Sequence, residues 1–477
     1  MDTLPGLHGD EAWVGLLGYS YKSHEVKTIF GMNHYTGVLQ PLIAFLSFSL
    51  FGTGVAQLRF FGVLFNVIGI ALMTKMLFNY NRYIPIIFLM LLGQSSIYLV
   101  FPRIAWEVNT FTMLMVALSI CILGKIISSH LANRLGWIII FLIINFVGTY
   151  NHVIFASFSL SALLGLIAWQ KFNKSTDYSQ ILPVLIVNLI NCFIFILTAK
   201  YFSELFDVKF LWISIPIALL AILSEGFILR KFLEQNFKVA FKIPRPVLLI
   251  FVIFGVPLFF YYHGLALIDV FSNYKVFSSI YSYRPSNAFK LVLTITGIFF
   301  GISSLYFILK DLVTKSKGSI PAFIITAHII TFNLFTTNNS IRYYLILFIL
   351  IFGYLSIKIF KSRIKNFILL IILISFSINA FIIIQIFSIG PKSYIVNRVM
   401  IGNKQIETSG HFLPKKNLVD SLSKHNIGNI EYASDRYFIE QPILFYKLIS
   451  PWSEDPNKSA YLDYRGEKGG FIIFIKK

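Results

Sequence analysis

The sequence predicts a polytopic α-helical membrane protein that ends in a small soluble α/β domain. Of its 477 residues 56% are hydrophobic and only 13% are charged, and the mean hydropathy is +0.74. The apolar runs are roughly 15–22 residues long and apolar on all sides, as expected for helices that cross a bilayer. The part after residue 390 lacks such runs and alternates short helical and extended segments instead.

Hydropathy predicts about twelve transmembrane helices. They are expected near residues 58–78, 83–101, 106–127, 136–150, 152–169, 181–199, 210–228, 247–262, 290–309, 320–337, 342–357 and 367–389. The short pair 136–150 and 152–169 should meet at a polar apex around His152, because unsatisfied backbone cannot face lipid. The apolar stretch 38–52 is too short for a full span, so we expect a helix that lies in the membrane interface.

The distribution of Lys and Arg over the loops predicts the orientation. One set of alternate loops is rich in these residues, whereas the other set is poorer in them and holds acidic residues. Because positively charged loops stay in the cytoplasm, residues 1–37, the loop 263–289 and everything after 390 should lie on the extracytoplasmic face of the membrane. The net charge of +20 therefore indicates orientation rather than binding to nucleic acid. Since this orientation places Met1 outside, we also expect a first transmembrane helix ahead of this sequence.

Three parts of the chain follow from this topology. Residues 1–57 should form an extracytoplasmic catalytic loop with the interfacial helix, residues 58–389 the transmembrane domain, and residues 390–477 the extracytoplasmic α/β domain. Within the last part the pattern predicts helices over 415–426 and 438–448 and strands over 429–433 and 470–476.

The sequence lacks the motifs of several common classes of enzymes and transporters. The sequence has no P-loop, no dinucleotide-binding glycine pattern, no Cys/His metal spacing and no nucleophile elbow. Cys121 and Cys192 fall within apolar spans, so no disulfide framework is implied. We expect no cofactor and no metal site; a divalent cation near Asp10 and Glu11 stays open, but the ligand spacing does not argue for one.

The candidate catalytic residues are Asp10 and Glu11, in the run LHGDEAW at residues 7–13. A carboxylate outside the membrane can act as a general base that takes a proton from an incoming hydroxyl. The alternative is structural: Asp10 would cap the helix that begins near Glu11, where acidic groups are stabilised by free N–H groups. The two interpretations are compatible, because a cap also fixes the position of the carboxylate.

Further polar residues share the predicted outer face with Asp10. The candidates for substrate binding are His34, Tyr35, Arg103, Glu107, His152, Arg342 and Tyr343. Four of them have a structural alternative: Arg103 and Glu107 are spaced for an i,i+4 ion pair, Arg342 could be an interface anchor, and His152 could serve in packing. The guanidinium groups suit a phosphate, which they can contact with two hydrogen bonds.

Short stretches of this chain resemble the GT-C superfamily of membrane glycosyltransferases, in particular glycosyltransferase family 39 with its protein O-mannosyltransferases and lipid A aminoarabinose transferases. The stretches are LHGDEAWVGL at 7–16, GMNHYTG at 31–37 with LQPL at 39–42, LFG at 50–52 and LRF at 58–60, Pro102-Arg103 ahead of Glu107, IRYY at 341–344, and YASDRYF at 432–438. The resemblance implies a GT-C fold of about thirteen spans once the expected first helix is included, and it implies that Asp10 is the catalytic base.

The expected function is therefore that of a glycosyltransferase. It would move a sugar, with inversion, from a polyprenyl-phosphate donor to a protein, lipid or glycan acceptor on the outer face. A transporter or flippase of a lipid-linked or anionic solute is the alternative, but that class favours charges in mid-span, whereas the candidates here lie at helix ends. A polysaccharide polymerase or ligase would rely on a larger late loop than 263–289.

Overall fold

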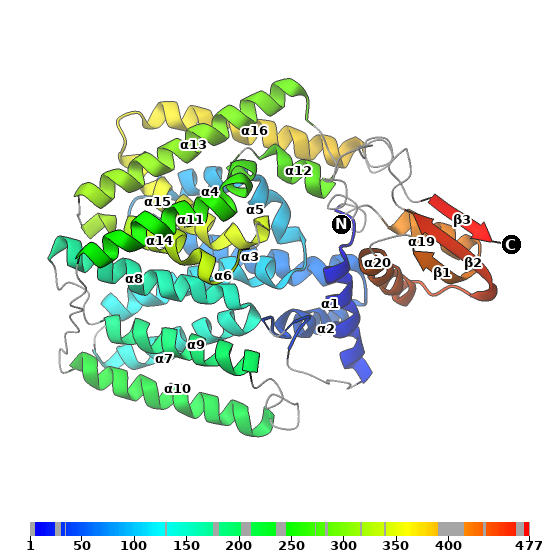
Figure 1. The fold of residues 1–477 in the computed structure, drawn as a ribbon, viewed down its shortest axis with the longest axis horizontal. Helices are drawn as coiled ribbons and strands as arrows, with labels where there is room; N and C mark the ends of the chain where they lie inside the picture. Colours follow the sequence, from blue (N-terminus) through cyan, green and yellow to red (C-terminus); the bar gives the residue numbers. More distant parts are fainter. Residues whose placement is uncertain are drawn as a thin grey trace.

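The computed structural model describes most of the chain. The described residues are 5–23, 30–33, 35–128, 131–174, 181–201, 211–234, 245–271, 273–281, 285–314, 317–337, 340–389, 415–432, 436–463 and 472–476. Long helices lie side by side in a bundle, and a small domain with a sheet projects from one end of it (Figure 1). The chain is thus a multi-pass helical membrane protein with a small α/β domain at its C-terminal end, which confirms the predicted fold class.

Every expected span coincides with a helix. These helices are α3 (Val55–Phe78), α4 (Ile84–Gln94) with α5 (Ser96–Val100), α6 (Glu107–Ser128), α7 (Leu131–Asn151), α8 (Ala156–Asn173), α9 (Leu182–Tyr201), α10 (Leu211–Glu234), α11 (Arg245–Phe271), α13 (Asn287–Thr314), α14 (Ile320–Thr331), α15 (Leu345–Lys361) and α16 (Lys365–Ile389). In the part of the chain that the structure describes, eight helices are long and apolar enough to cross a membrane. The number is nine if α4 and α5, which are bent by 79°, form one broken span.

Shorter elements connect these helices. Three of them are the helices α1 (Gly9–Ser20), α2 (Leu39–Phe51) and α12 (Tyr274–Tyr281). The others are the 3₁₀ turns η1 (Tyr21–Ser23), η2 (Phe101–Arg103), η3 (Val153–Phe155), η7 (Lys317–Ser319), η8 (Phe332–Leu334) and η9 (Ile341–Tyr344). The apolar helix α2 has only 13 residues, so the stretch expected to lie in the interface is helical and shorter than a span. The loop expected at 263–289 is smaller than predicted, because α11 continues to Phe271 and α12 fills part of the remainder.

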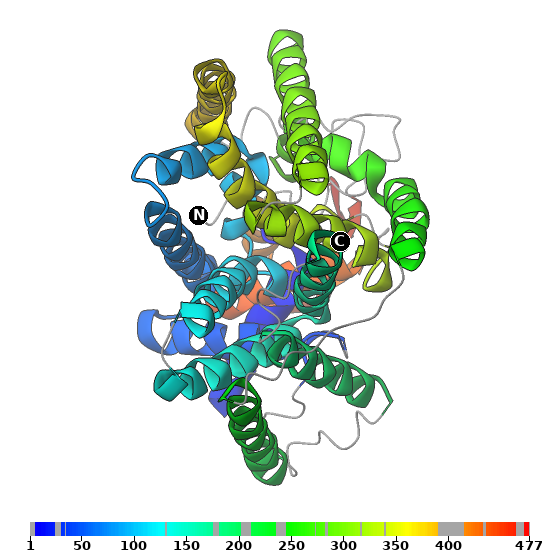
Figure 2. The same ribbon diagram turned by 90° about the vertical axis from the view of Figure 1, so that its left-hand side faces the viewer.

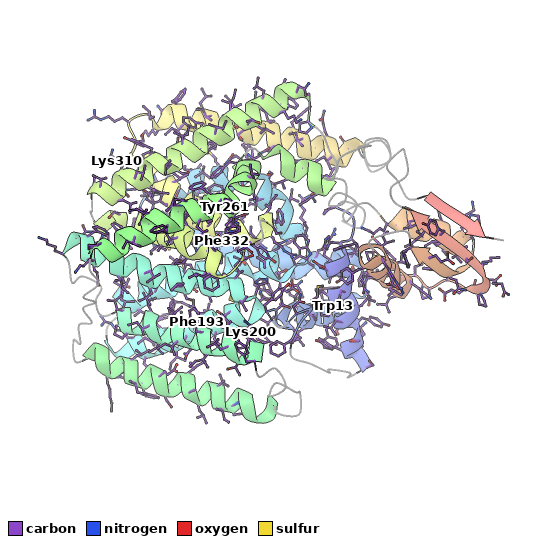
Figure 3. All side chains as sticks on the ribbon, viewed as in Figure 1. Trp13, Phe193, Lys200, Tyr261, Lys310 and Phe332 are labelled. Atoms are coloured by element: carbon purple, nitrogen blue, oxygen red, sulfur yellow. The ribbon has the colours of Figure 1, made fainter. Side chains whose placement is uncertain are left out.

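The bundle has inner and outer helices. Most of α8 and α15 is buried, whereas α3 and α16 expose large apolar side chains along one side. Figure 2 shows α16 (gold) at the outer edge of the bundle, where lipid would surround it. Lys310, near the C-terminal end of α13, lies at the end of the bundle away from the C-terminal domain, whereas Trp13 of α1 lies near that domain (Figure 3). Lys310 and the candidate catalytic loop thus lie towards opposite ends of the bundle.

The C-terminal domain contains α19 (Lys416–Lys424), β1 (Ile427–Tyr432), α20 (Arg436–Ile449), β2 (Asp455–Asp463) and β3 (Ile472–Lys476). The sheet has the order β1-β2-β3, in which β1 and β2 are parallel and β2 and β3 antiparallel. The two predicted helices and two predicted strands are present. The strand β2 has no counterpart in the prediction, because it opens with Asp, Pro, Asn and Lys, which are depleted in strands.

The C-terminal domain and the N-terminal segment share one hydrophobic core. Buried residues of this core come from both ends of the chain, and they include Leu7, Ala12, Val14, Phe48, Leu58, Leu418, Leu422, Ile439, Ile443 and Phe445. Phe445 of α20 is fully buried and lies directly over Gly15 of α1, where any side chain would collide with its ring. This packing brings α20 beside α1, as Figure 1 shows, and so brings the tail to the candidate catalytic loop.

Candidate functional site

The helix α1 begins with a capping box that involves His8 rather than Asp10. His8 has extended backbone angles, and its Nδ1 atom accepts a hydrogen bond of 3.1 Å from the N–H of Asp10. In return the N–H of His8 donates to Oε2 of Glu11 at 3.1 Å. The expected alternative role of Asp10 as the cap is therefore taken by His8, and the Asp10 carboxyl points elsewhere.

Glu11 forms a buried ion pair with Arg59 of α3. The guanidinium donates from Nε to Oε1 at 2.9 Å and from Nη2 to Oε2 at 2.8 Å, and the two side chains are 1% and 0% exposed. Glu11 also accepts from the N–H of Ala105 at 2.7 Å, while Arg59 donates to the carbonyl of Pro5 at 3.0 Å. Every oxygen of the Glu11 carboxyl is thus engaged, and this group holds the catalytic loop, α3 and the turn before α6 together.

Asp10 instead faces Arg342, which is 332 positions away in the sequence. Oδ2 of Asp10 lies 3.4 Å from Nη1 of Arg342, and the two side chains keep 18% and 23% of their surface exposed. Burial raises the pKa of the Asp10 carboxyl, and Arg342 opposes this shift. The geometry gives a partly accessible carboxylate beside a permanent cation, which is what a base next to an anion-binding group requires.

Aromatic rings surround the Arg342 guanidinium. It stacks over Trp106 at 4.6 Å from the ring centroid and over Tyr343 at 5.2 Å. Its Nε atom is buried and has no hydrogen-bond partner among the described residues. A guanidinium that packs against two rings and keeps part of its side chain exposed can bind an oxyanion at its exposed nitrogen atoms.

His152 and Tyr35 extend this wall. His152 contacts the ring of Tyr343 at 5.6 Å and that of Tyr35 at 5.5 Å. Its Nδ1 atom accepts from the N–H of Ile154, so its ring orientation is fixed by the apex between α7 and α8. Burial lowers the pKa of His152 to about 3, and His152 is therefore neutral at physiological pH. Tyr35 is 44% exposed and forms the accessible end of this row of rings.

Arg103 and Glu107 do not form the expected ion pair, and they face different surroundings. Arg103 lies over the ring of Phe387 at 5.1 Å and interacts with the hydroxyl of Tyr281. Glu107 is 8% exposed and lies close enough to Asp10 and Arg342 to interact with both electrostatically. The structure therefore gathers Asp10, Tyr35, Glu107, His152, Arg342 and Tyr343 at one place, holds Glu11 directly beneath it, and directs Arg103 towards α12 and α16.

The structure adds residues that the sequence reasoning did not select. Trp106 and His8 pack against one another at 4.9 Å, and Tyr437 of α20 reaches Asp10 from the tail. Arg59 had a sequence signal, because it is a lone charge at the start of an apolar run. His34 lies outside the described residues. Among the residues that the structure describes, no group of three His, Cys, Asp or Glu side chains could hold a metal ion.

No protein-family model and no curated protein matches this sequence. Solved structures show a distant likeness. ArnT from Cupriavidus metallidurans bound to undecaprenyl phosphate has 10% identity and a TM-score of 0.39 over 98% of this chain and 94% of that one. The apo state of the same ArnT has 9% identity and a TM-score of 0.40 over 99% of this chain and 94% of that one. The apo oligosaccharyltransferase of Archaeoglobus fulgidus has 13% identity and a TM-score of 0.45 over 92% of this chain and 56% of that one. At this distance the comparisons assign no residue, ligand or activity to this chain.

Proposed function

We propose that this protein is a GT-C-type glycosyltransferase that transfers a sugar from a polyprenyl-phosphate donor to an acceptor hydroxyl on the extracytoplasmic face of a bacterial inner membrane. The observation that carries the proposal is the contact between Asp10 and Arg342. A partly exposed carboxylate of the N-terminal loop and an aromatic-walled guanidinium of the membrane domain meet at 3.4 Å. A base and a phosphate-binding cation side by side are the two groups that such a transfer requires.

The proposed reaction is a single displacement with inversion. The acceptor oxygen attacks the anomeric carbon, and the bond between that carbon and the donor phosphate oxygen breaks. Asp10 takes the proton of the acceptor hydroxyl, and the polyprenyl phosphate leaves as an anion beside Arg342. The phosphate takes the electron pair of the broken bond and is stable with the additional negative charge, so no protein acid is needed, unlike in glycosidases, where two carboxylates divide the work.

The aromatic row suits the sugar. Tyr35, His152 and Tyr343 follow one another at ring distances of 5.5 and 5.6 Å, and Tyr35 is exposed at the end. Flat rings pack against the C–H faces of a pyranose, and the neutral His152 and the tyrosine hydroxyls can hydrogen-bond to its oxygens. Glu107 lies on the same side of Asp10 and can accept from a sugar hydroxyl. Arg103 lies further towards α12 and α16 and can contact the lipid phosphate only from that side.

The transporter or flippase alternative predicts movement without bond breakage. Labelled sugar on a polyprenyl-phosphate carrier, added to membranes that contain the full-length protein, separates the two. The proposal predicts label in an acceptor fraction of protein, lipid or glycan and free polyprenyl phosphate as the second product. Label that crosses the membrane while still attached to its carrier would support the transporter instead. Membranes with Asp10→Asn serve as the control for background transfer.

A further inference from the structure

The first turn of α20 lies directly on the first turn of α1. A Cβ atom placed on Gly9 would lie 2.9 Å from Cδ1 of Phe438 and 3.1 Å from Cε1 of Tyr437. Phe438 also packs edge-on against the ring of His8 at 5.1 Å. The absence of a side chain at Gly9 is therefore what allows the tail to approach the residue next to Asp10 so closely.

Tyr437 is oriented by this contact towards the site. Its ring packs at right angles against Phe438, and its hydroxyl lies 3.6 Å from the sulfur of Met32, in the loop that also carries Tyr35. The same hydroxyl faces the Asp10 carboxyl closely enough for the two groups to interact electrostatically. Burial and the neighbouring Asp10 carboxylate raise the pKa of Tyr437, so its hydroxyl keeps its proton and can donate it in a hydrogen bond.

We propose that Tyr437 is a positioning residue for Asp10, and that the C-terminal domain is thereby an integral part of the site. The inference rests on the proposed function, in which Asp10 is the base. Arg342 contacts Oδ2 of Asp10 from the membrane domain, and Tyr437 approaches the carboxyl from the tail. Two donors from opposite sides fix the rotation of a short side chain that its own helix does not hold.

The effect on the base has a defined sign. The ionisable groups that interact with Asp10 are His8 and Glu11 of its own segment, Tyr35, Glu107, Arg342 and Tyr437. A hydroxyl that donates to a carboxylate stabilises the charged form and lowers the pKa of the carboxyl. Removal of the hydroxyl should therefore raise the pKa of Asp10, so that the base becomes protonated at a higher pH than in the native protein.

Tyr437→Phe in the full chain tests the inference, because it keeps the ring that packs on Gly9 and removes only the hydroxyl. Tyr432→Phe is the matched control, since that tyrosine lies on β1 of the same domain and its ring is covered by Arg436. We expect Tyr437→Phe to lower kcat about ten-fold and to move the acidic limb of the pH–rate profile up by about one pH unit, with Tyr432→Phe unchanged in both.

Three outcomes would overturn the inference: an unchanged rate, an unmoved acidic limb, or a loss of activity that follows a loss of thermal stability not seen in Tyr432→Phe. The proposed function is tested separately by Asp10→Asn. If Asp10→Asn abolishes transfer while Tyr437→Phe behaves like the native protein, only the role of Tyr437 is refuted. If Asp10→Asn still transfers sugar, the base assignment itself is wrong.

Discussion

Replacement of Glu11 by glutamine tests whether this acid holds the loop together rather than takes part in chemistry. Glutamine keeps one oxygen, which can still accept from Nε of Arg59 and from the N–H of Ala105. Its amide nitrogen would stand where Oε2 now accepts from Nη2 of Arg59 and from the N–H of His8. Nη2 of Arg59 and the N–H of His8 would then face the amide nitrogen, which is itself a donor. Arg59, which is 1% exposed, would also lose its counter-charge.

The expected cost is about 3–5 kcal/mol, which is typical when one partner of a fully buried ion pair is removed. The matched control is Glu440→Gln, because Glu440 also forms a two-pronged pair with an arginine, but Arg436 is 70% exposed there. An exposed pair of this kind contributes little to stability, because water screens both charges. The two chemically identical substitutions should therefore differ clearly in their effect on stability.

Thermal unfolding of the purified proteins in detergent measures this difference. We expect a clearly lower midpoint for Glu11→Gln and one close to the native value for Glu440→Gln. The fraction of Glu11→Gln that remains folded should retain turnover within about ten-fold of the native protein, because Glu11 is not the base. Equal midpoints for the two variants would refute the structural role of Glu11, and a folded but inactive Glu11→Gln would return it to the catalytic machinery.

Three further predictions concern the phosphate site, a buried lysine and the orientation. Arg342→Ala should raise the KM for the polyprenyl-phosphate donor at least about ten-fold, and Arg342→Lys should restore it only partly, because lysine cannot make the two-pronged contact. The exposed control Arg363→Ala should leave the donor KM unchanged. An unchanged donor KM in Arg342→Ala would mean that Arg342 is an interface anchor. Burial lowers the pKa of Lys415 from 10.5 to about 7, so the unfolded chain binds more protons there and stability should rise between these pH values. Unfolding midpoints measured across this range should rise less steeply in Lys415→Met than in the exposed neighbour Lys416→Met, and equal slopes would contradict the shift. A phosphatase fused to the C-terminus should be active and a fluorescent protein that folds only in the cytoplasm dark, and the reverse result would refute the orientation.

Much of the fold could be predicted because hydropathy is a local property. Each span is recognised by a run of apolar residues, and each of the twelve expected spans coincides with helical structure, with the pair α4 and α5 at 83–101. The strand β2 was not predicted, because its first four residues are of types that disfavour strands. In the structure, pairing with β1 outweighs that preference. The bend between α4 and α5 also had no local signal. The N–H of Ser96 beyond the break is satisfied by the side chain of Asn273, which lies far away in the sequence.

The sequence could predict which residues share the candidate site, but not which side chains contact one another there. Alternation of the loops brought Asp10, His152 and Arg342 to one face, and the structure places them together. The separate roles of Asp10 and Glu11 could not be read from adjacent acids, because they depend on which arginine each one meets in the fold. Tyr437 was out of reach for the same reason, since its position depends on the packing of α20 against Gly9.

The most direct test of the central claim is sugar transfer by Asp10→Asn. Asparagine keeps the size of the side chain and cannot accept the proton of the acceptor hydroxyl. Asp420→Asn is the matched control, because Asp420 is an exposed residue of α19 in the same protein. With labelled polyprenyl-phosphate sugar and equal amounts of folded protein, the account predicts a loss of at least about 10²-fold in turnover for Asp10→Asn and none for Asp420→Asn. Turnover near the native value in Asp10→Asn would contradict the account.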